Sequence, residues 1–582
     1  MDSTLGTMMD RLRAILVNPL TDQTFAEIAA IYDNVAYIYL YLEANKAHVN
    51  YDSIRHWRNA YYSDEELNEL LRDSLTRFEC ESPLLEESRQ AYLTFLNAHK
   101  PQESAEASTS SKLLDEAIHS VTSAQEDKRK LLNRLGIEDS QGNPDTTFYR
   151  LLSGTDNPET REKLANAMQL TRDKRLDEIT RTIDQMISNR MREARANGFK
   201  SALDSTMSRC AISEQSAEDL IHGYLTRAVR EQGELNAEVG EALGDQNTPM
   251  AHFGYFVRQI QSDHQIPLFD LAACLQFAFE VARRTLGVTI EFVDVTNPHV
   301  MTASVTRAAY PEHIIGHISF DLWQTDAQHK TANHTLGMRN RTDWGGVVQK
   351  PVAYVSCRFR RDAEGREKIT FQNVHSLFHE IGHALNHVLI EQRLPTTSGL
   401  DYLPLERLEN LSMWFEKWIY HQEFDEYLAA SGISSEGLTL CRRIKSLEYR
   451  RTHIDRAVTA ALDFRIHRHG CGIQQSFAEL DEEYGISTVC SLGELLPSFT
   501  QPMLQANPGG YFAYLWGAAY SAEMYTPYHG HPLADINTEC DAEMKFRECL
   551  DTKAESTVPA INAVFDFYNH TSRARSEEKR NS

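Results

Sequence analysis

The sequence predicts a mostly α-helical protein that contains a small β-sheet. Over residues 1 to about 260, apolar residues recur at spacings of three and four on a charged background, as in amphipathic helices. From about residue 285, short runs rich in β-branched and aromatic residues are typical of strands, and helical periodicity returns at Val374 and continues to about 568. We therefore expect a helical scaffold lobe at 1–260, a second lobe at 261–570 and a disordered tail at 571–582.

Individual segments support this division in chain order. Amphipathic helices are predicted at 64–78 and 161–195, and between them the Ser-, Ala- and Glu-rich segment 101–112 predicts a surface loop. Strands bounded by Gly, Pro or charged residues are predicted at 287–295, 316–323, 350–359 and 368–374. The helical stretch that follows the last strand carries the residues that are most informative about function.

Composition and charge exclude several classes of protein. Hydrophobic residues make up 41% and charged residues 24% of the 582 residues, which is typical of a folded globular protein. The 59 Lys and Arg against 83 Asp and Glu leave a net charge of −24, and a chain this acidic repels nucleic-acid phosphates. No apolar run reaches about 18 residues, the length of a membrane-spanning helix. We expect neither a nucleic-acid partner nor a membrane association.

The first residues and the cysteines indicate the compartment. The sequence begins with acidic residues where a targeting peptide is basic, so a cytoplasmic location is expected. The nine cysteines are scattered and form no CxxC pair, which predicts free thiols. We also expect a monomer.

His379-Glu380-Ile381-Gly382-His383 is an HExxH motif inside an apolar helical stretch. Four residues at about 100° each place the two imidazoles about 40° apart on consecutive turns, so both can bind one zinc ion. A catalytic zinc takes three protein ligands and a water molecule, and Glu380 is placed to face that water as general base. The spacing therefore predicts one zinc ion per chain.

A third ligand is expected from a second helix after the turn at Pro404. The segment 401–418 supplies Glu406, Glu409 and Glu416, and spacing alone does not decide between Glu406 and Glu409. His375 and His387 extend the face of the first helix, but three consecutive histidines on one face span too great a length to share one metal. For these two histidines we expect supporting or packing roles.

The sequence around these residues resembles the M3 oligopeptidases. Residues 374–385, VHSLFHEIGHAL, are similar to the family's zinc helix, VxTLFHEFGHAL, and residues 409–418, ENLSMWFEKW, resemble its Glu-x-Pro-Ser-Gln-x-x-Glu-x-Trp segment. The likeness extends over roughly residues 150 to 550. The resemblance implies Glu409 as third zinc ligand, Glu416 as the partner of a ligand, and a two-lobed helical fold with a deep central channel.

A glycine- and tyrosine-rich segment at 509–516, GGYFAYLW, resembles the family's Gly-Gly-Tyr loop and Tyr-Leu-Trp segment. A tyrosine hydroxyl near zinc would stabilise the oxyanion that develops during peptide hydrolysis. Tyr514 is the first candidate for this role and Tyr511 the second. The family's histidine upstream of the loop has no counterpart between Ser498 and Gly510, and the loop is about four residues shorter.

The resemblance implies a zinc endopeptidase that hydrolyses internal bonds of short, unfolded oligopeptides. Zinc held by His379, His383 and Glu409 would activate water, with Glu380 as general base. The departures around the tyrosine loop motivate an alternative, a protein of the same fold that binds peptides and metal without efficient turnover.

Overall fold

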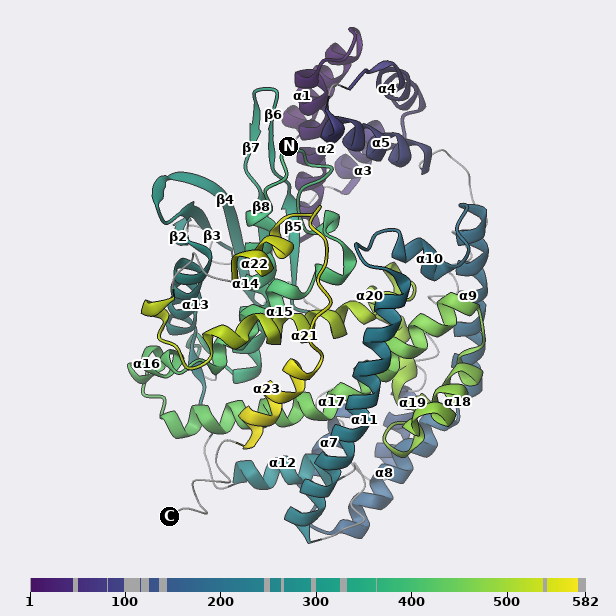
Figure 1. Cartoon of the computed structure of the whole chain (residues 1–582), viewed down its shortest axis with the longest axis vertical. Helices are drawn as coiled ribbons and strands as arrows, with labels where there is room; N and C mark the ends of the chain where they lie inside the picture. Colours follow the sequence, from purple (N-terminus) through teal and green to yellow (C-terminus); the bar gives the residue numbers. More distant parts are fainter. Residues whose placement is uncertain are drawn as a thin grey trace. The chain divides into compact units, whose positions relative to one another are not determined.

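The computed structural model describes residues 2–44, 51–80, 82–98, 116, 125–134, 144–244, 252–262, 266–294, 300–324, 332–362, 364–536 and 542–573. Within these ranges the chain is mostly helical with small sheets, which confirms the predicted fold class (Figure 1). The loop predicted at 101–112 and nearly all of the predicted tail at 571–582 lie outside the described residues.

The chain forms two compact units, and each unit combines three separate stretches of sequence. Unit 1 comprises residues 1–102, 268–432 and 527–555, and unit 2 comprises residues 103–267, 433–526 and 556–582. This division differs from the expected lobes at 1–260 and 261–570. The N-terminal helices contact the sheet, and Asn34 donates a hydrogen bond to Gln349, so the first hundred residues belong to the sheet-containing unit.

Unit 1 contains the β-strands and the helices that cover them. Its helices are α1 (Asp2–Leu16), α2 (Asp22–Ala44), α3 (Tyr51–Tyr62), α4 (Glu65–Arg77), α5 (Pro83–Ala98), α13 (Leu271–Leu286), α14 (Phe371–Leu389), α15 (Asn410–Lys417), α16 (Glu423–Ala429) and α22 (Ala542–Leu550). Its strands are β1 (Phe269–Asp270), β2 (Val288–Asp294), β3 (Met301–Arg307), β4 (Tyr310–Trp323), β5 (His334–Arg339), β6 (Thr342–Trp344), β7 (Val347–Gln349), β8 (Val352–Phe359) and β9 (Lys368–Ile369).

Five of these strands form one sheet in the order β2-β3-β4-β8-β5. Neighbouring strands are antiparallel except β4 and β8, which pair in parallel, and β5 is an edge strand. Helix α14 packs against β8, β5 and β4, and α2 also contacts β5. Seven of the eight residues of β8 are buried, because this central strand has neighbours on both edges and α14 against one face.

The described residues of unit 2 form helices and the loops between them, without a strand. Its helices are α7 (Pro144–Gly154), α8 (Pro158–Asp173), α9 (Leu176–Ala196), α10 (Ala202–Met207), α11 (Glu214–Leu243), α12 (Phe253–Ser262), α17 (Ser435–His469), α18 (Ile473–Tyr484), α19 (Leu492–Leu495), α20 (Pro502–Ala506), α21 (Phe512–Tyr525) and α23 (Asn562–Arg573). The long helices α11 and α17 pack along each other, and α23 packs against α17 and α21.

The strands predicted at 287–295, 316–323 and 350–359 are confirmed by β2, β4 and β8. The strand predicted at 368–374 is wrong beyond Ile369, because Thr370 caps a helix instead. The Thr370 side chain accepts a hydrogen bond from the amide of Asn373, and α14 therefore begins at Phe371.

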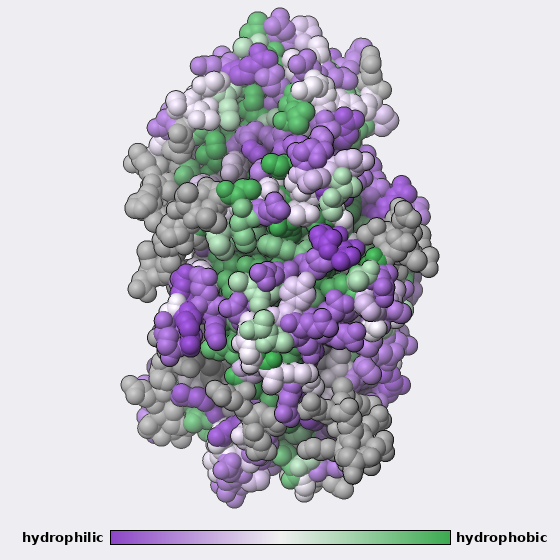
Figure 2. Space-filling model, turned by 90° about the vertical axis from the view of Figure 1, so that its left-hand side faces the viewer, coloured by the Kyte–Doolittle hydropathy of each residue, from purple (hydrophilic) through white to green (hydrophobic). Residues whose placement is uncertain are grey.

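The described cysteines and helices match what the sequence predicts about disulfides and membrane spans. The eight cysteines among the described residues are all free, as expected. None of the described helices has both the length and the apolar character that a membrane span requires. Figure 2 shows hydrophobic residues gathered near the middle of one face, with hydrophilic residues around them.

Candidate active site

Helix α14 carries both histidines of the HExxH motif on one side. Their ring centroids lie 4.7 Å apart, and the ring planes are nearly perpendicular at 88°. The side chains of His379 and His383 are 22% and 12% exposed, so both are largely buried yet still reachable from solvent. The helical spacing thus brings the two imidazole rings together, as the sequence predicts.

Glu409 completes this pair from the start of α15. Its Oε2 atom lies 3.5 Å from Nε2 of His379 and 3.3 Å from Nε2 of His383. One ligand atom from each of the three residues falls within 4.8 Å of the others. Glu409 is 5% exposed, so the carboxylate faces the histidines and not bulk water.

Gly382 permits the close approach of α15 to α14. A Cβ atom at this position would lie 2.6 Å from Cα of Ser412 and 2.9 Å from the carbonyl oxygen of Leu411. Real Cβ atoms essentially never come so close to other heavy atoms. The missing side chain at 382 therefore allows Glu409 to reach the two histidines.

Hydrogen bonds hold the Glu409 carboxylate in place. The Ser412 hydroxyl lies 2.9 Å from Oε2 of Glu409. Burial opposes ionisation of Glu409, but the neighbouring imidazoles of His383 and His379, together with Ser412, lower its pKa to about 2. The carboxylate therefore stays charged and favours a cation between the three side chains.

Glu416, the other acid implied by the resemblance, lies behind the first histidine. Its Oε1 atom accepts a hydrogen bond from Nδ1 of His379 at 2.6 Å, and its Oε2 lies 3.1 Å from Nε2 of His375. Burial opposes a charge on the His379 ring, yet the hydrogen bond and charge of Glu416, with Glu409, raise its pKa to about 10. The two carboxylates thus favour a positive charge at the His379 ring. The hydrogen bond to Nδ1 leaves Nε2 directed at Glu409.

The three ligand atoms fit a tetrahedral zinc ion. Bonds of about 2.1 Å from zinc to nitrogen and oxygen place neighbouring ligand atoms about 3.4 Å apart in a tetrahedron. The two distances from Glu409 to the histidines, 3.5 Å and 3.3 Å, match this value. Two imidazoles and one carboxylate also form a donor set that leaves a fourth position for water.

Glu380 lies on α14 beside the first histidine and contacts the edge strand β5. The Thr335 hydroxyl lies 2.8 Å from Oε2 of Glu380 and 2.9 Å from its backbone oxygen. This contact holds one carboxylate oxygen toward the strand. No pattern in the sequence indicates Thr335, because it lies 45 residues before Glu380 and only the packing of β5 on α14 brings the two residues together.

The remaining histidine and glutamate candidates lie away from the ligand cluster. Glu406 is fully buried in a 3-10 turn at Leu405–Arg407, and its Oε1 is 3.8 Å from Nε of Arg407. His387 connects two other segments, since its Nδ1 accepts a hydrogen bond from the Leu400 amide and its Nε2 donates one to the carbonyl of Arg339. Burial lowers the pKa of His387 to about 4, so this ring is neutral.

The two candidate tyrosines belong to unit 2. Asp463 of α17 accepts hydrogen bonds from the amides of Gly509 and Tyr511, which shapes the turn before α21. The rings of Tyr511 and Tyr514 contact each other with centroids 5.1 Å apart, and burial raises the pKa of Tyr511. Their role near a metal stays a prediction.

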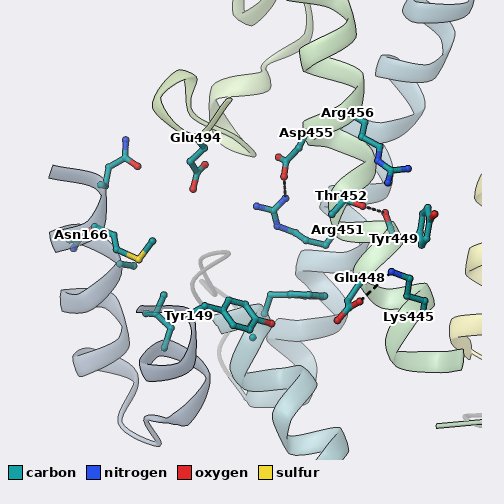
Figure 3. Close-up of a pocket in the computed structure, with 16 residues that line it drawn as sticks. Tyr149, Asn166, Lys445, Glu448, Tyr449, Arg451, Thr452, Asp455, Arg456 and Glu494 are labelled. Atoms are coloured by element: carbon teal, nitrogen blue, oxygen red, sulfur yellow. Dashed lines mark hydrogen bonds and ion pairs between the residues drawn. The ribbon is translucent and has the colours of Figure 1, made fainter. Parts of the chain in front are cut away.

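Unit 2 also contains a cavity of about 710 Å³ (Figure 3). Acidic and basic groups of its wall pair with each other: Arg451 bonds Asp455 at 2.9 Å, and Lys445 lies 3.8 Å from Glu448. Arg456 lies over the ring of Tyr449. Because these charges are balanced within the wall, the cavity favours no particular ligand charge.

Most of the chain is similar to a known family of peptidases. Residues 151–538 match the model of peptidase family M3. Oligopeptidase A of Escherichia coli (strain K12) is 27% identical over 378 residues, which cover 60% of this chain and 55% of that protein. Oligopeptidase A of Salmonella typhimurium (strain LT2) is 26% identical over 375 residues, 59% of this chain and 54% of that protein. The chain thus spans about half the length of these curated relatives.

Solved structures support the fold over a longer stretch. A crystal structure described as an oligoendopeptidase F from Bacillus anthracis superposes with a TM-score of 0.58, covering 99% of this chain and 97% of that one. The sequence identity in this superposition is 11%, so the likeness concerns the fold alone.

Proposed function

Because the chain belongs to peptidase family M3, a family of metallopeptidases, we propose that it is a zinc-dependent endopeptidase that hydrolyses internal bonds of short, unfolded oligopeptides. One observation carries this proposal. His379, His383 and Glu409 present three ligand atoms within 4.8 Å of each other, and the carboxylate of Glu380 comes from the same helix as the two histidines.

Each residue of the site has a separate role in the proposed hydrolysis. Zinc bound by the two imidazoles and Glu409 would polarise the attacking water molecule and the scissile carbonyl group. Glu380 takes the proton from the water and passes it to the amine of the departing product. Thr335 holds Oε2 of Glu380, which orients the carboxylate during both proton transfers.

Other side chains position these groups or meet the developing charge. Glu416 fixes the ring of His379 through Nδ1, so that Nε2 stays available as a ligand. We assign Tyr514, and secondarily Tyr511, to the oxyanion of the tetrahedral intermediate. The monomeric state and the cytoplasmic location stay predictions from the sequence.

The proposal is tested with a quenched fluorescent peptide. We expect hydrolysis that a chelator abolishes and that one equivalent of zinc per chain restores. Glu380→Gln should retain zinc but lose nearly all turnover, because the glutamate acts as base and not as ligand. Loss of zinc from this variant, or a wild-type rate with zinc bound, contradicts the assigned role.

The same assay addresses the alternative of a protein without turnover. If the purified wild type binds one zinc and a peptide but releases no cleaved product, the chain is a peptide-binding protein with a peptidase fold. If products are released, sequencing them by mass spectrometry distinguishes internal cleavage from trimming of the peptide ends.

A further inference from the structure

Unit 1 contains a second concave site, away from the ligand cluster. A cavity of about 240 Å³ lies between helices α2, α3 and α5, strand β5 and the loop at 395–402. Two acidic side chains and four tyrosines contribute to its wall, namely Asp33, Asp401, Tyr32, Tyr62, Tyr92 and Tyr402. This combination of groups is absent from the cavity of unit 2.

The acidic groups of this cavity are not balanced by basic ones. No Lys, Arg or His is among the described residues that line it. The side chain of Asp401 makes no hydrogen bond or ion pair within the described part of the chain, and the residue is exposed, so its carboxylate can be reached from solvent. The charge of Arg339 lowers the pKa of Asp33, but the Arg339 guanidinium lies over the ring of Tyr37, and Arg339 is not among the residues that line the cavity.

Asp33 is held by one of its two carboxyl oxygens. The amide of Asn340 donates to Oδ2 at 2.9 Å, and the side chain of Gln349 donates to the same atom. Oδ1 accepts no hydrogen bond from the described residues. Burial raises the pKa of Asp33 to about 7, although the hydrogen bonds from Asn340 and Gln349 and the charge of Arg339 oppose this rise.

The tyrosines surround the same space with aromatic rings. The ring of Tyr32 lies 5.7 Å from that of Tyr62 and 6.1 Å from that of Tyr92, measured between centroids. Burial, together with the charges of Asp401 and Asp33, raises the pKa of Tyr402 to about 12. Aromatic rings combined with uncompensated carboxylates bind organic cations.

Strand β5 connects this cavity with the candidate active site. Thr335 of β5 contacts Glu380, whereas Gly337, Met338 and Asn340 line the cavity. A strand rises about 3.3 Å per residue, so the cavity begins at Gly337, about 7 Å along the chain from Thr335, and extends to Asn340, about 17 Å from it. An extended peptide has the same rise, and the outer edge of β5 pairs with no other strand of the described residues.

We propose that this cavity binds the ammonium group of a peptide substrate, two to five residues from the cleaved bond. The group is a lysine side chain or the N-terminal amine, which share the alkylammonium chemistry that the two acids and four rings recognise. The peptide part of this inference rests on the proposed function. The evidence for the cavity, which is lined by two acids and by no described basic residue, does not depend on the metal site.

The first experiment measures binding without catalysis. Pentylammonium chloride, which mimics a lysine side chain, and 1-pentanol, its neutral counterpart, are titrated into the full chain by ligand-observed NMR. Pentylammonium should bind wild type about tenfold more tightly than Asp401→Asn, whereas pentanol should not distinguish the two. Asp10→Asn is the matched control, because Asp10 is exposed on α1 and its replacement changes the net charge equally.

The second experiment measures specificity. In a peptide series, one lysine is moved along the chain and compared with norleucine at the same position, with and without N-terminal acetylation. We expect kcat/KM to rise about tenfold for lysine two to five residues from the cleaved bond. This gain should be lost in Asp401→Asn but not in Asp10→Asn. Loss of the gain on acetylation alone identifies the N-terminal amine as the bound group. Tyr402→Leu retains the charges and should lose part of the gain.

The outcomes separate the two proposals. Equal binding of pentylammonium to wild type and Asp401→Asn overturns the cation cavity. Hydrolysis without a lysine or amine preference at these positions overturns its role in substrate recognition and leaves the peptidase function intact. Selective pentylammonium binding in a chain that hydrolyses no peptide overturns the peptidase function and supports the cavity.

Discussion

Replacing Gly382 by alanine tests how the third ligand reaches the two histidines. The added Cβ would lie 2.6 Å from Cα of Ser412 and 3.0 Å from Cβ of Phe415, whereas ordinary contacts begin at 3.4 Å. Relieving the first contact requires α15 to move by about 0.8 Å. Both partner atoms belong to the backbone or its first side-chain carbon, so no flexible side chain can turn away instead.

The displacement is large compared with the tolerance of a zinc site. Ligand distances in such sites vary by about 0.2 Å, and Glu409 moves with α15 because the amide of Met413 bonds its carbonyl. We expect Gly382→Ala to weaken zinc binding at least about 100-fold, in the range seen when the support of a ligand is lost. Overpacking should also lower the free energy of unfolding by roughly 1–2 kcal/mol, after the higher helix propensity of alanine is included.

A zinc competition titration measures this effect, and thermal unfolding verifies that the variant is folded. Gly233→Ala is the control, because Gly233 is exposed in α11 and a Cβ there meets nothing within 4 Å. That variant should bind zinc like wild type and be slightly more stable. Equal zinc affinity in both variants would refute the argument that close helix packing places Glu409.

Four further predictions concern the site and its surroundings. Glu409→Ala should weaken zinc binding by a large factor, whereas Glu406→Ala should destabilise the fold with little effect on zinc affinity. The opposite ranking in a zinc competition titration contradicts Glu409 as the third ligand. Glu416→Ala should weaken zinc binding about 10- to 100-fold, and Glu416→Gln less, because the amide oxygen can still accept the bond from the His379 ring. The pKa of His387 is 6.5 in the unfolded chain and about 4 in the folded chain. Its contribution to the free energy of unfolding, up to about 3 kcal/mol, is therefore present above pH 6.5 and is lost as the pH falls toward 4. In thermal unfolding, His387→Gln should lose less stability on acidification than wild type. The net charge of −24 should attract cationic peptides, so at low salt peptides flanked by lysine should be cleaved with higher kcat/KM than peptides flanked by glutamate. If the advantage of lysine does not decrease with added salt, this electrostatic attraction is refuted.

Features that depend on one helix or strand could be read from the sequence. The two imidazoles of HExxH meet because a helix places residues four apart on neighbouring turns, whatever surrounds it. The strands near 290, 320 and 355 and the helical character of both flanking regions follow from local periodicity in the same way. Among the predicted strands, the error at 370–374 arose where the Thr370 cap ends a strand-like run and begins α14.

Features that join distant segments were decided by the tertiary structure. The spacing of Glu406 and Glu409 left both open as ligands, since it assumed one continuous helix; the structure places Glu406 in a 3-10 turn and only Glu409 beside the histidines. Thr335 and the cavity around Asp401 depend on β5, which packs on α14 with one face and contacts α2. The physical reason is that backbone dihedral angles repeat locally and leave a periodic pattern, whereas a contact between separate elements depends on side-chain volume at both surfaces, as the missing side chain of Gly382 illustrates.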